Sequence, residues 1–204
     1  MTEKVKTTIK NLEENGYQAE YFQTAKEAKE YLLKEIPMGQ SVGFGGSMTL
    51  QEVGIYDSLK ERGSQVFWHW HPEEGGDRIS TMKKAMITDV YLSGINAVTE
   101  DGKMVNIDGT GNRLSGLLFG HDHLYMVAGV NKITKNYEDA MIRVKNVATP
   151  KNAARFQLNT PCATLGKCMA CTSPDRICNV TLVMEKQHGG IPTTVILIGE
   201  KLGY

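Results

Sequence analysis

Hydrophobic and polar residues alternate with two different periods near the start of the chain. Val5, Ile9 and Leu12 recur at the spacing of one helical face, and Gly16 follows where a helix C-cap is expected. Residues 17–22 (YQAEYF) then alternate like a short strand. The chain is therefore predicted to open with a helix and a strand.

A second helix is predicted directly after this strand. Thr24 and Glu27 have the spacing of a capping box, and the amphipathic run that follows them ends before Pro37. Residues 1–36 are therefore expected to form an N-terminal, mostly helical region.

The order of strand and helix is repeated over the following residues. The predicted strands are SVGFGG (41–46), SQVFWHW (64–70) and VYLSGI (90–95), and the predicted helices between them are TLQEVGIYDSLKER (49–62) and DRISTMKKAMITD (77–89). Strands that alternate with helices are typical of an α/β fold with a mostly parallel sheet flanked by helices.

The pattern changes after residue 95. Asp101-Gly102 lies between two alternating runs and predicts an inserted β-hairpin. Further strands are expected at 124–130, 179–186 and 193–200, and residues 136–157 read as one long helix in which Pro150 is expected to cause a kink or a division. No linker or repeat interrupts the pattern, so residues 1–204 are expected to form a single domain.

Composition places the chain among ordinary soluble globular proteins. Hydrophobic residues make up 41% of the 204 residues and charged residues 23%. The 23 basic and 23 acidic residues cancel, which argues against nucleic-acid binding and a polybasic membrane surface. No apolar run is long enough to span a membrane, and the N-terminus does not resemble an export signal. We therefore expect a cytoplasmic protein with reduced thiols.

The stretch GFGGSMT (43–49) joins a predicted strand to a predicted helix. Glycines let the backbone approach a ligand, and free N–H groups at a helix start attract anions. The expected anion contacts come from Gly45, Gly46, Ser47 and Thr49. Alternatively the stretch is a tight turn without a ligand, with a helix cap at Thr49.

A second glycine turn, NIDGTGNR (106–113), also combines glycines with the start of a predicted helix. Its candidate ligand-binding residues are Asp108, Gly109, Thr110, Gly111, Asn112 and Arg113. Arg113 can form a bidentate contact with an anion, and both turns are expected at the carboxyl ends of the parallel strands, where α/β folds bind ligands. The competing interpretation is that Asp108 caps the next helix while Arg113 makes a surface ion pair.

Several longer stretches together resemble the LUD-domain family of lactate-utilisation proteins, formerly a domain of unknown function (DUF162). The resemblance covers about residues 42–204, and DGTGNR and the cysteine-rich stretch are its most specific parts. The stretches are GFGGSMTLQEVGIYDSL, GINAVTEDGKMVNIDGTGNR, VAGVNKI, TPCATLGKCMACTSPDRICN and VILIGEKLGY.

The resemblance implies a fold like that of ribose-5-phosphate isomerase, glucosamine-6-phosphate deaminase and the CoA-transferases. Residues 43–49 match the position of the phosphate-binding turn in the phosphosugar enzymes, and residues 109–113 resemble their second ligand loop. It also implies a role in the oxidation of L-lactate to pyruvate, beside iron–sulfur proteins. Lys132, in GVNKI, is expected to act as a second cation for the ligand.

All four cysteines lie within residues 159–179. Cys162, Cys168, Cys171 and Cys178 have the spacing C-x5-C-x2-C-x6-C. Four thiolates suit tetrahedral zinc and equally a 4Fe-4S cluster. The alternatives are redox-active thiols or inert buried cysteines. Spacing does not choose between the metals, and the iron–sulfur partners implied by the resemblance favour the cluster.

Two histidine pairs have the same spacing. His69 and His71 would share one side of a strand, with Glu73 and Glu74 close behind, but two histidines alone make a weak metal site. The pair at residues 121 and 123 is expected on the surface.

The leading hypothesis combines these features. It is a LUD-domain protein that binds a small anionic metabolite and a four-cysteine metal or iron–sulfur centre, as an accessory or electron-transfer subunit in 2-hydroxy acid oxidation. The alternatives are an isomerase or transferase for phosphosugars or CoA esters, with Asp108 as general base, and a non-catalytic, zinc-stabilised regulatory module. Whether the chain forms a homo-oligomer is left open.

Overall fold

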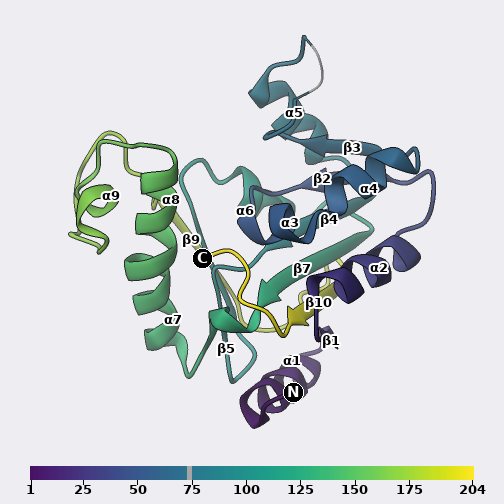
Figure 1. Cartoon of the computed structure of the whole chain (residues 1–204), viewed down its shortest axis with the longest axis horizontal. Coiled ribbons are helices and arrows are strands. Elements are labelled where there is room, and N and C mark those ends of the chain that lie inside the picture. The colour runs from purple at the N-terminus through teal and green to yellow at the C-terminus, as the bar shows by residue number, and fades with distance from the viewer. Residues whose placement is uncertain (73–74) are drawn as a thin grey trace.

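The centre of the molecule is a six-stranded sheet in which every pair of neighbouring strands is parallel (Figure 1). The computed structural model describes residues 1–72 and 75–204, so Glu73 and Glu74 lie outside the described residues. The strands, in sheet order, are β1 (Gln18–Phe22), β10 (Thr193–Ile198), β7 (His123–Gly129), β4 (Val90–Gly94), β2 (Ser41–Phe44) and β3 (Gln65–Trp68). The prediction of an α/β fold with a mostly parallel sheet is confirmed.

Helices cover both faces of this sheet, because its central strands are apolar on both sides. Along β10, Val195 and Leu197 join one hydrophobic core, whereas Ile196 and Ile198 join the other. The helices over the first face are α1 (Glu3–Glu14), α5 (Arg78–Ala85) and α6 (Asn112–Gly116), and those over the second are α2 (Ala25–Glu35), α3 (Met48–Val53) and α4 (Ile55–Glu61).

The predicted hairpin belongs to a second, smaller sheet. The order of its strands is β8 (Ile133–Thr134), β5 (Ala97–Thr99), β6 (Met104–Asp108) and β9 (Val180–Met184). β5 and β6 pair antiparallel around Gly102, which has a φ of 82°. The Asp-Gly signal for a hairpin is therefore confirmed.

One long helical arm stands beside the main sheet. It consists of α7 (Tyr137–Arg143), the π-helical turn η2 (Val144–Ala148) and α8 (Thr149–Arg155), and the short helix α9 (Pro161–Leu165) follows it (Figure 1). Pro150 has no N–H to donate to the preceding turn, and the helix widens into the π turn there. The expected kink or division is thus a local widening of one continuous helix.

The helix starts show one correct prediction and two corrections. Thr24 and Glu27 form the predicted capping box of α2. The helix after β2 is capped by Ser47, whose hydroxyl accepts from the Leu50 N–H, and not by Thr49. The single helix expected over 49–62 is split at Gly54, which has a left-handed φ of 68°.

None of the described helices is both long and apolar enough to cross a membrane.

Candidate functional site

A cavity of about 180 Å³ lies at the carboxyl ends of the parallel strands. Its walls come from the turns after β2 and β3, the end of β4, the turn after β6, and one side of α8. Both predicted glycine turns contribute to it, through residues 46–48, 107–110, 112 and 113. The tertiary structure therefore brings the two turns together as the sequence predicts, and adds a third wall from the helical arm.

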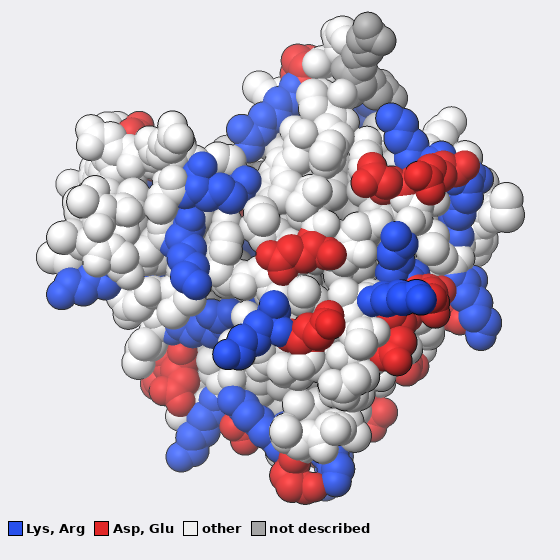
Figure 2. Space-filling view, in the orientation of Figure 1, with Lys and Arg blue, Asp and Glu red and all other residues white. Residues whose placement is uncertain are grey.

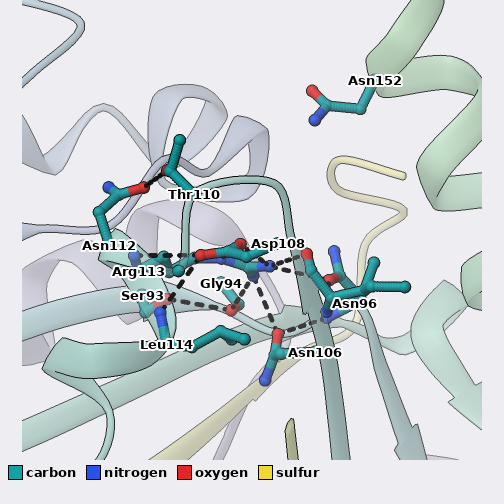
Figure 3. A network of polar contacts seen from close by, with 12 residues as sticks. Ser93, Gly94, Asn96, Asn106, Asp108, Thr110, Asn112, Arg113, Leu114 and Asn152 are labelled. Carbon is teal, nitrogen blue, oxygen red and sulfur yellow. Dashed lines mark hydrogen bonds and ion pairs between the residues drawn. The ribbon is translucent and has the colours of Figure 1, made fainter. Parts of the chain in front are cut away.

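Asp108 and Arg113 form a buried ion pair on one wall of the cavity (Figure 3). The Asp108 Oδ1 atom accepts from Arg113 Nε at 3.0 Å and from Nη2 at 2.9 Å. Its Oδ2 atom accepts from the backbone N–H groups of Arg113 and Leu114 at the start of α6. Asp108 is thus the cap of α6, which is the competing interpretation of this residue, but the ion pair is buried instead of on the surface.

The remaining N–H groups of Arg113 are also engaged. Nη1 donates to the Gly94 carbonyl at 3.2 Å and to Asn106 Oδ1 at 2.9 Å. Nη2 donates to Asn96 Oδ1 at 2.9 Å and to the Ile107 carbonyl at 2.8 Å. A guanidinium has five N–H donors, so Arg113 has none left for a bidentate contact with an anion. Its observed role is to hold the second glycine turn against the end of β4.

Gly45 and Gly94 leave no room for a side chain where the hydrogen bonds of Arg113 approach the first glycine turn. A Cβ on Gly45 would lie 2.7 Å from Cγ of Arg113, and a Cβ on Gly94 would collide with Oγ of Ser47. A Cβ on Gly46 would meet the His69 ring at 3.3 Å. These glycines allow close packing around the cavity, and Gly46 and Gly94 also line it.

The second turn has its own local order. Gly111 is the residue before α6 and has a left-handed conformation with a φ of 81°, and Thr110 donates from its hydroxyl to Asn112 Oδ1 at 2.7 Å. A Cβ on Gly109 would lie 3.3 Å from Cα of Ile177, so the cysteine-rich stretch packs directly on this turn. Thr110 and Asn112 line the cavity as predicted candidates, and their contact with a ligand stays a prediction.

Lys132 lies at the cavity with only 3% of its surface exposed. Its Nζ atom donates to the Thr49 hydroxyl at 2.7 Å. Burial lowers the pKa of Lys132 to about 7. Near neutral pH its amine is therefore only partly protonated, so the predicted second cation carries its charge only part of the time.

His69 is also buried at the cavity, but His71 is not its partner. Strand β3 ends at Trp68, so the two histidines do not share one side of a strand. The His71 ring stacks on Tyr56 at 4.5 Å and contacts Gln51. Burial, followed by the charges of nearby arginines, lowers the pKa of His69 to about 4, and the imidazole is neutral at neutral pH.

The second histidine pair does not lie on the surface as predicted. His121 is 5% exposed, stacks on Tyr91 at 4.7 Å and contacts the Thr88 carbonyl at 2.7 Å. His123 is half-buried and contacts the Thr194 hydroxyl. The prediction of a surface position was wrong, because His123 is the first residue of β7 and His121 lies just before this strand.

The third wall holds cationic and polar residues that the sequence analysis did not single out. Arg155 stacks over Trp70 at 4.5 Å and over Phe156 at 4.0 Å, and Arg78 lies 6.0 Å from the latter ring. Figure 2 shows basic side chains over α8 on the side facing the main sheet. Asn152 extends from the same helix, across the space from the ion pair (Figure 3). The signal in the sequence was the helical spacing of residues 149, 152 and 156.

The four cysteines do not converge in this structure. Among the described residues, no three His, Cys, Asp or Glu side chains are grouped so that they could hold a metal ion. Cys162 is buried and contacts the Thr160 hydroxyl, whereas Cys178 accepts from Arg176 Nε at 3.1 Å. The observed arrangement does not fit zinc or a 4Fe-4S cluster, and a centre formed after rearrangement of the loop stays a prediction. The loop also contains α9, so it is not wholly irregular.

Comparisons with known proteins agree with this architecture. The family described as the LUD domain matches residues 5–198. A crystal structure of a DUF162 family protein from Deinococcus radiodurans is similar, with 13% identity, 97% of each chain covered and a TM-score of 0.57. Ribose 5-phosphate isomerase A from Neisseria gonorrhoeae, with 14% identity, covers 55% of this chain and 54% of its own, at a TM-score of 0.34 that supports no argument. No curated protein matches the sequence significantly.

Proposed function

This chain belongs to the LUD-domain family, and we propose that its cavity binds a small carboxylate of the 2-hydroxy or 2-oxo acid class. Lactate and pyruvate are the substrates implied by the resemblance to lactate-utilisation proteins. In this proposal the chain is an accessory or electron-transfer subunit, and separate iron–sulfur subunits accept the electrons released when the hydroxy acid is oxidised.

The observation that carries the proposal is the pair of arginines that line the cavity, Arg155 on α8 and Arg78 at the start of α5. Among the described residues, no carboxylate lies within ion-pair distance of Arg78 or Arg155. Among the described residues that line the cavity, Asp108 is the acidic one, and Arg113 already neutralises it. Two arginines without an acidic partner among the described residues favour an anionic ligand.

Arg155 is oriented for such a ligand. Its Nε atom donates to the Tyr204 hydroxyl at 2.8 Å, and both Nε and Nη2 contact Asn152 Oδ1. Its Nη1 atom donates no hydrogen bond to any described residue, so two N–H groups are available to a carboxylate. Stacking on Trp70 and Phe156 fixes the plane of the guanidinium.

The size and polarity of the cavity support a small ligand. A volume of about 180 Å³ is below the roughly 300–1,000 Å³ of pockets for drug-sized molecules. The hydroxyl of Thr149 is buried in the wall without a hydrogen-bond partner among the described residues. A small acid with a hydroxyl or carbonyl group next to its carboxylate supplies a partner for such a group.

Isothermal titration calorimetry tests the proposal. L-Lactate, pyruvate, acetate and ribose 5-phosphate are titrated into the full chain and into the Arg155→Gln variant. We expect the 2-hydroxy or 2-oxo acid to bind more tightly than acetate, and Arg155→Gln to weaken this binding at least tenfold, since a charge-assisted contact contributes roughly 1.5–3 kcal/mol.

The matched control is Lys151→Gln, which removes an exposed cation from the same helix and should leave the affinity unchanged. Circular dichroism confirms that both variants are folded. Tighter binding of ribose 5-phosphate than of either acid would favour the phosphosugar alternative. Binding of neither acid, or equal binding by Arg155→Gln and the unmodified chain, would refute the proposed function.

A further inference from the structure

Lys132 is a buried amine at the cavity, and Thr49 is its one hydrogen-bond partner among the described residues. It follows β7 in the 3-10 turn η1 (Val130–Lys132), and its Nζ atom donates to the Thr49 hydroxyl at 2.7 Å. Among the described residues, no carboxylate lies within ion-pair distance of it. Buried lysines normally have a carboxylate partner or contribute to chemistry, so this amine requires an explanation.

The charges around Lys132 disfavour its protonated form. Burial is the largest effect, and the positive charges of Arg143 and Arg113 add to it. Glu52 acts in the opposite direction, but its carboxylate accepts from the Gly203 N–H at 2.8 Å. The resulting pKa of about 7 leaves a substantial fraction of neutral amine at neutral pH. A neutral amine is a nucleophile.

The Thr49 hydroxyl is arranged to hold this amine by one N–H group. Thr49 donates its own proton to the Leu202 carbonyl at 3.4 Å, so its oxygen accepts from Lys132. The neutral amine therefore uses an N–H in this contact and keeps its lone pair. Gly203 packs closely beside the pair, where a Cβ would lie 3.2 Å from Nζ and 2.7 Å from the Thr49 hydroxyl.

We propose that Lys132 is a nucleophile that forms a Schiff base with the carbonyl carbon of a small 2-oxo acid bound in the cavity. This inference rests on the proposed function, in which Arg155 binds the carboxylate. Arg155 and Lys132 both line the small cavity, and Tyr204, whose hydroxyl accepts from Arg155, directly follows Gly203, which packs beside the Lys132 amine. A carboxylate held by Arg155 therefore leaves the adjacent keto carbon in the same cavity as the Lys132 amine. A 2-hydroxy acid has a hydroxyl instead of a keto carbonyl at C2 and forms no such adduct.

The step balances without an oxidant or a reductant. The neutral amine attacks the carbonyl carbon, a C–N bond forms, and the carbonyl oxygen takes up a proton as the nitrogen loses one. The C–O bond of the carbinolamine then breaks, and water leaves. The imine that remains takes up one proton to become the iminium ion.

Reductive trapping tests the inference. The full chain is mixed with pyruvate and then with sodium borohydride, which delivers hydride to the iminium carbon and leaves a stable secondary amine. Intact-mass spectrometry and peptide mapping then locate the modified lysine. We expect the peptide containing Lys132 to carry the adduct, and L-lactate with borohydride to give none.

Two variants separate this site from ordinary surface modification. Lys132→Met should lower the modified fraction at least tenfold, whereas Lys135→Met, which removes an exposed lysine three residues away, should not change it. Circular dichroism and the calorimetric affinity for pyruvate report whether Lys132→Met is folded. Labelling that is equal in all three proteins would overturn the inference.

The outcome also separates the inference from the proposed function. If pyruvate binds with the expected Arg155 dependence but no adduct is trapped at Lys132, the Schiff base is refuted and the binding site remains. If pyruvate neither binds nor is trapped, both are refuted.

Discussion

The carboxylate of Asp108 is enclosed by the side chain and backbone of Arg113, five residues later in the chain. One carboxylate oxygen accepts from Nε and Nη2, at 3.0 and 2.9 Å, and the other accepts from the Arg113 N–H at 3.1 Å. Asp108 and Arg113, which the sequence suggested as ligand contacts, therefore bind each other and form part of the cavity wall. In the proposed function the carboxylate is therefore bound by Arg155 and Arg78, and not by Arg113.

The first prediction concerns this pair. Arg113→Met leaves the Asp108 carboxylate buried without its charge partner, and we expect a loss of about 3–5 kcal/mol in the free energy of unfolding. Urea denaturation followed by circular dichroism measures it. Lys10→Met, which breaks an exposed pair with Glu14 on α1, is the control and should cost less than about 1 kcal/mol. A similar small loss in both variants would contradict the structural role.

The second prediction concerns the close approach of Gly45 to Arg113. Gly45→Ala places a methyl group 2.7 Å from Cγ of Arg113, so the guanidinium network must shift. We expect a destabilisation of roughly 1–3 kcal/mol and weaker binding of the 2-oxo acid. Gly189→Ala is the matched control, because its methyl group would meet no atom within 4 Å. Thermal unfolding and calorimetry measure both effects, and an unchanged Gly45→Ala protein would show that the turn is less tightly packed.

The third prediction is a pH dependence of stability that comes from His69. Burial and the charges of Arg78 and Arg155 hold its pKa at about 4, below the ordinary 6.5, and Asp108 acts in the opposite direction. Between these values the unfolded chain binds a proton that the folded chain does not. The stability that His69 contributes is therefore complete above pH 6.5 and is lost as the pH falls to about 4.

The test is to compare the unmodified chain with His69→Gln between pH 7 and pH 4.5. The variant lacks this titration, so its melting temperature should fall less on acidification, by an amount equivalent to at most about 3 kcal/mol. His71→Gln, at an exposed position in the same segment, should have the smaller effect of the two. Equal acid sensitivity of His69→Gln and the unmodified chain would be inconsistent with a buried, neutral imidazole.

The fourth prediction concerns the cysteines. In the arrangement described, Cys168, Cys171 and Cys178 are half-buried free thiols and Cys162 is buried. A thiol reagent should therefore label the first three in the folded protein and Cys162 only on unfolding. Metal analysis after oxygen-free purification is the parallel measurement. Protection of all four thiols together with bound iron or zinc would contradict this arrangement and support the centre that the spacing predicts.

Much of the fold could be read from local patterns. The capping box at Thr24 and the turn at Gly102 each depend on a few neighbouring residues, and both are confirmed. The residues of β10 alternate between two cores, as expected for a strand buried on both faces. The errors arose where a contact distant in sequence decided the outcome. His121 is buried because it meets Thr88 and Tyr91, which no local pattern indicates.

The sequence by itself determined the order of strands and helices, the family and the two glycine turns at the cavity, because these depend on periodicity and short motifs. Only the tertiary structure decided which arginines keep N–H groups free of contacts with the described residues. Arg113 donates its N–H groups to acceptors that include residues of β4 and β6. Arg155, on a separate helix, has two N–H groups that donate to no described residue. The physical reason is that a hydrogen-bond donor can be assigned to a ligand only after its contacts with the rest of the folded chain are known.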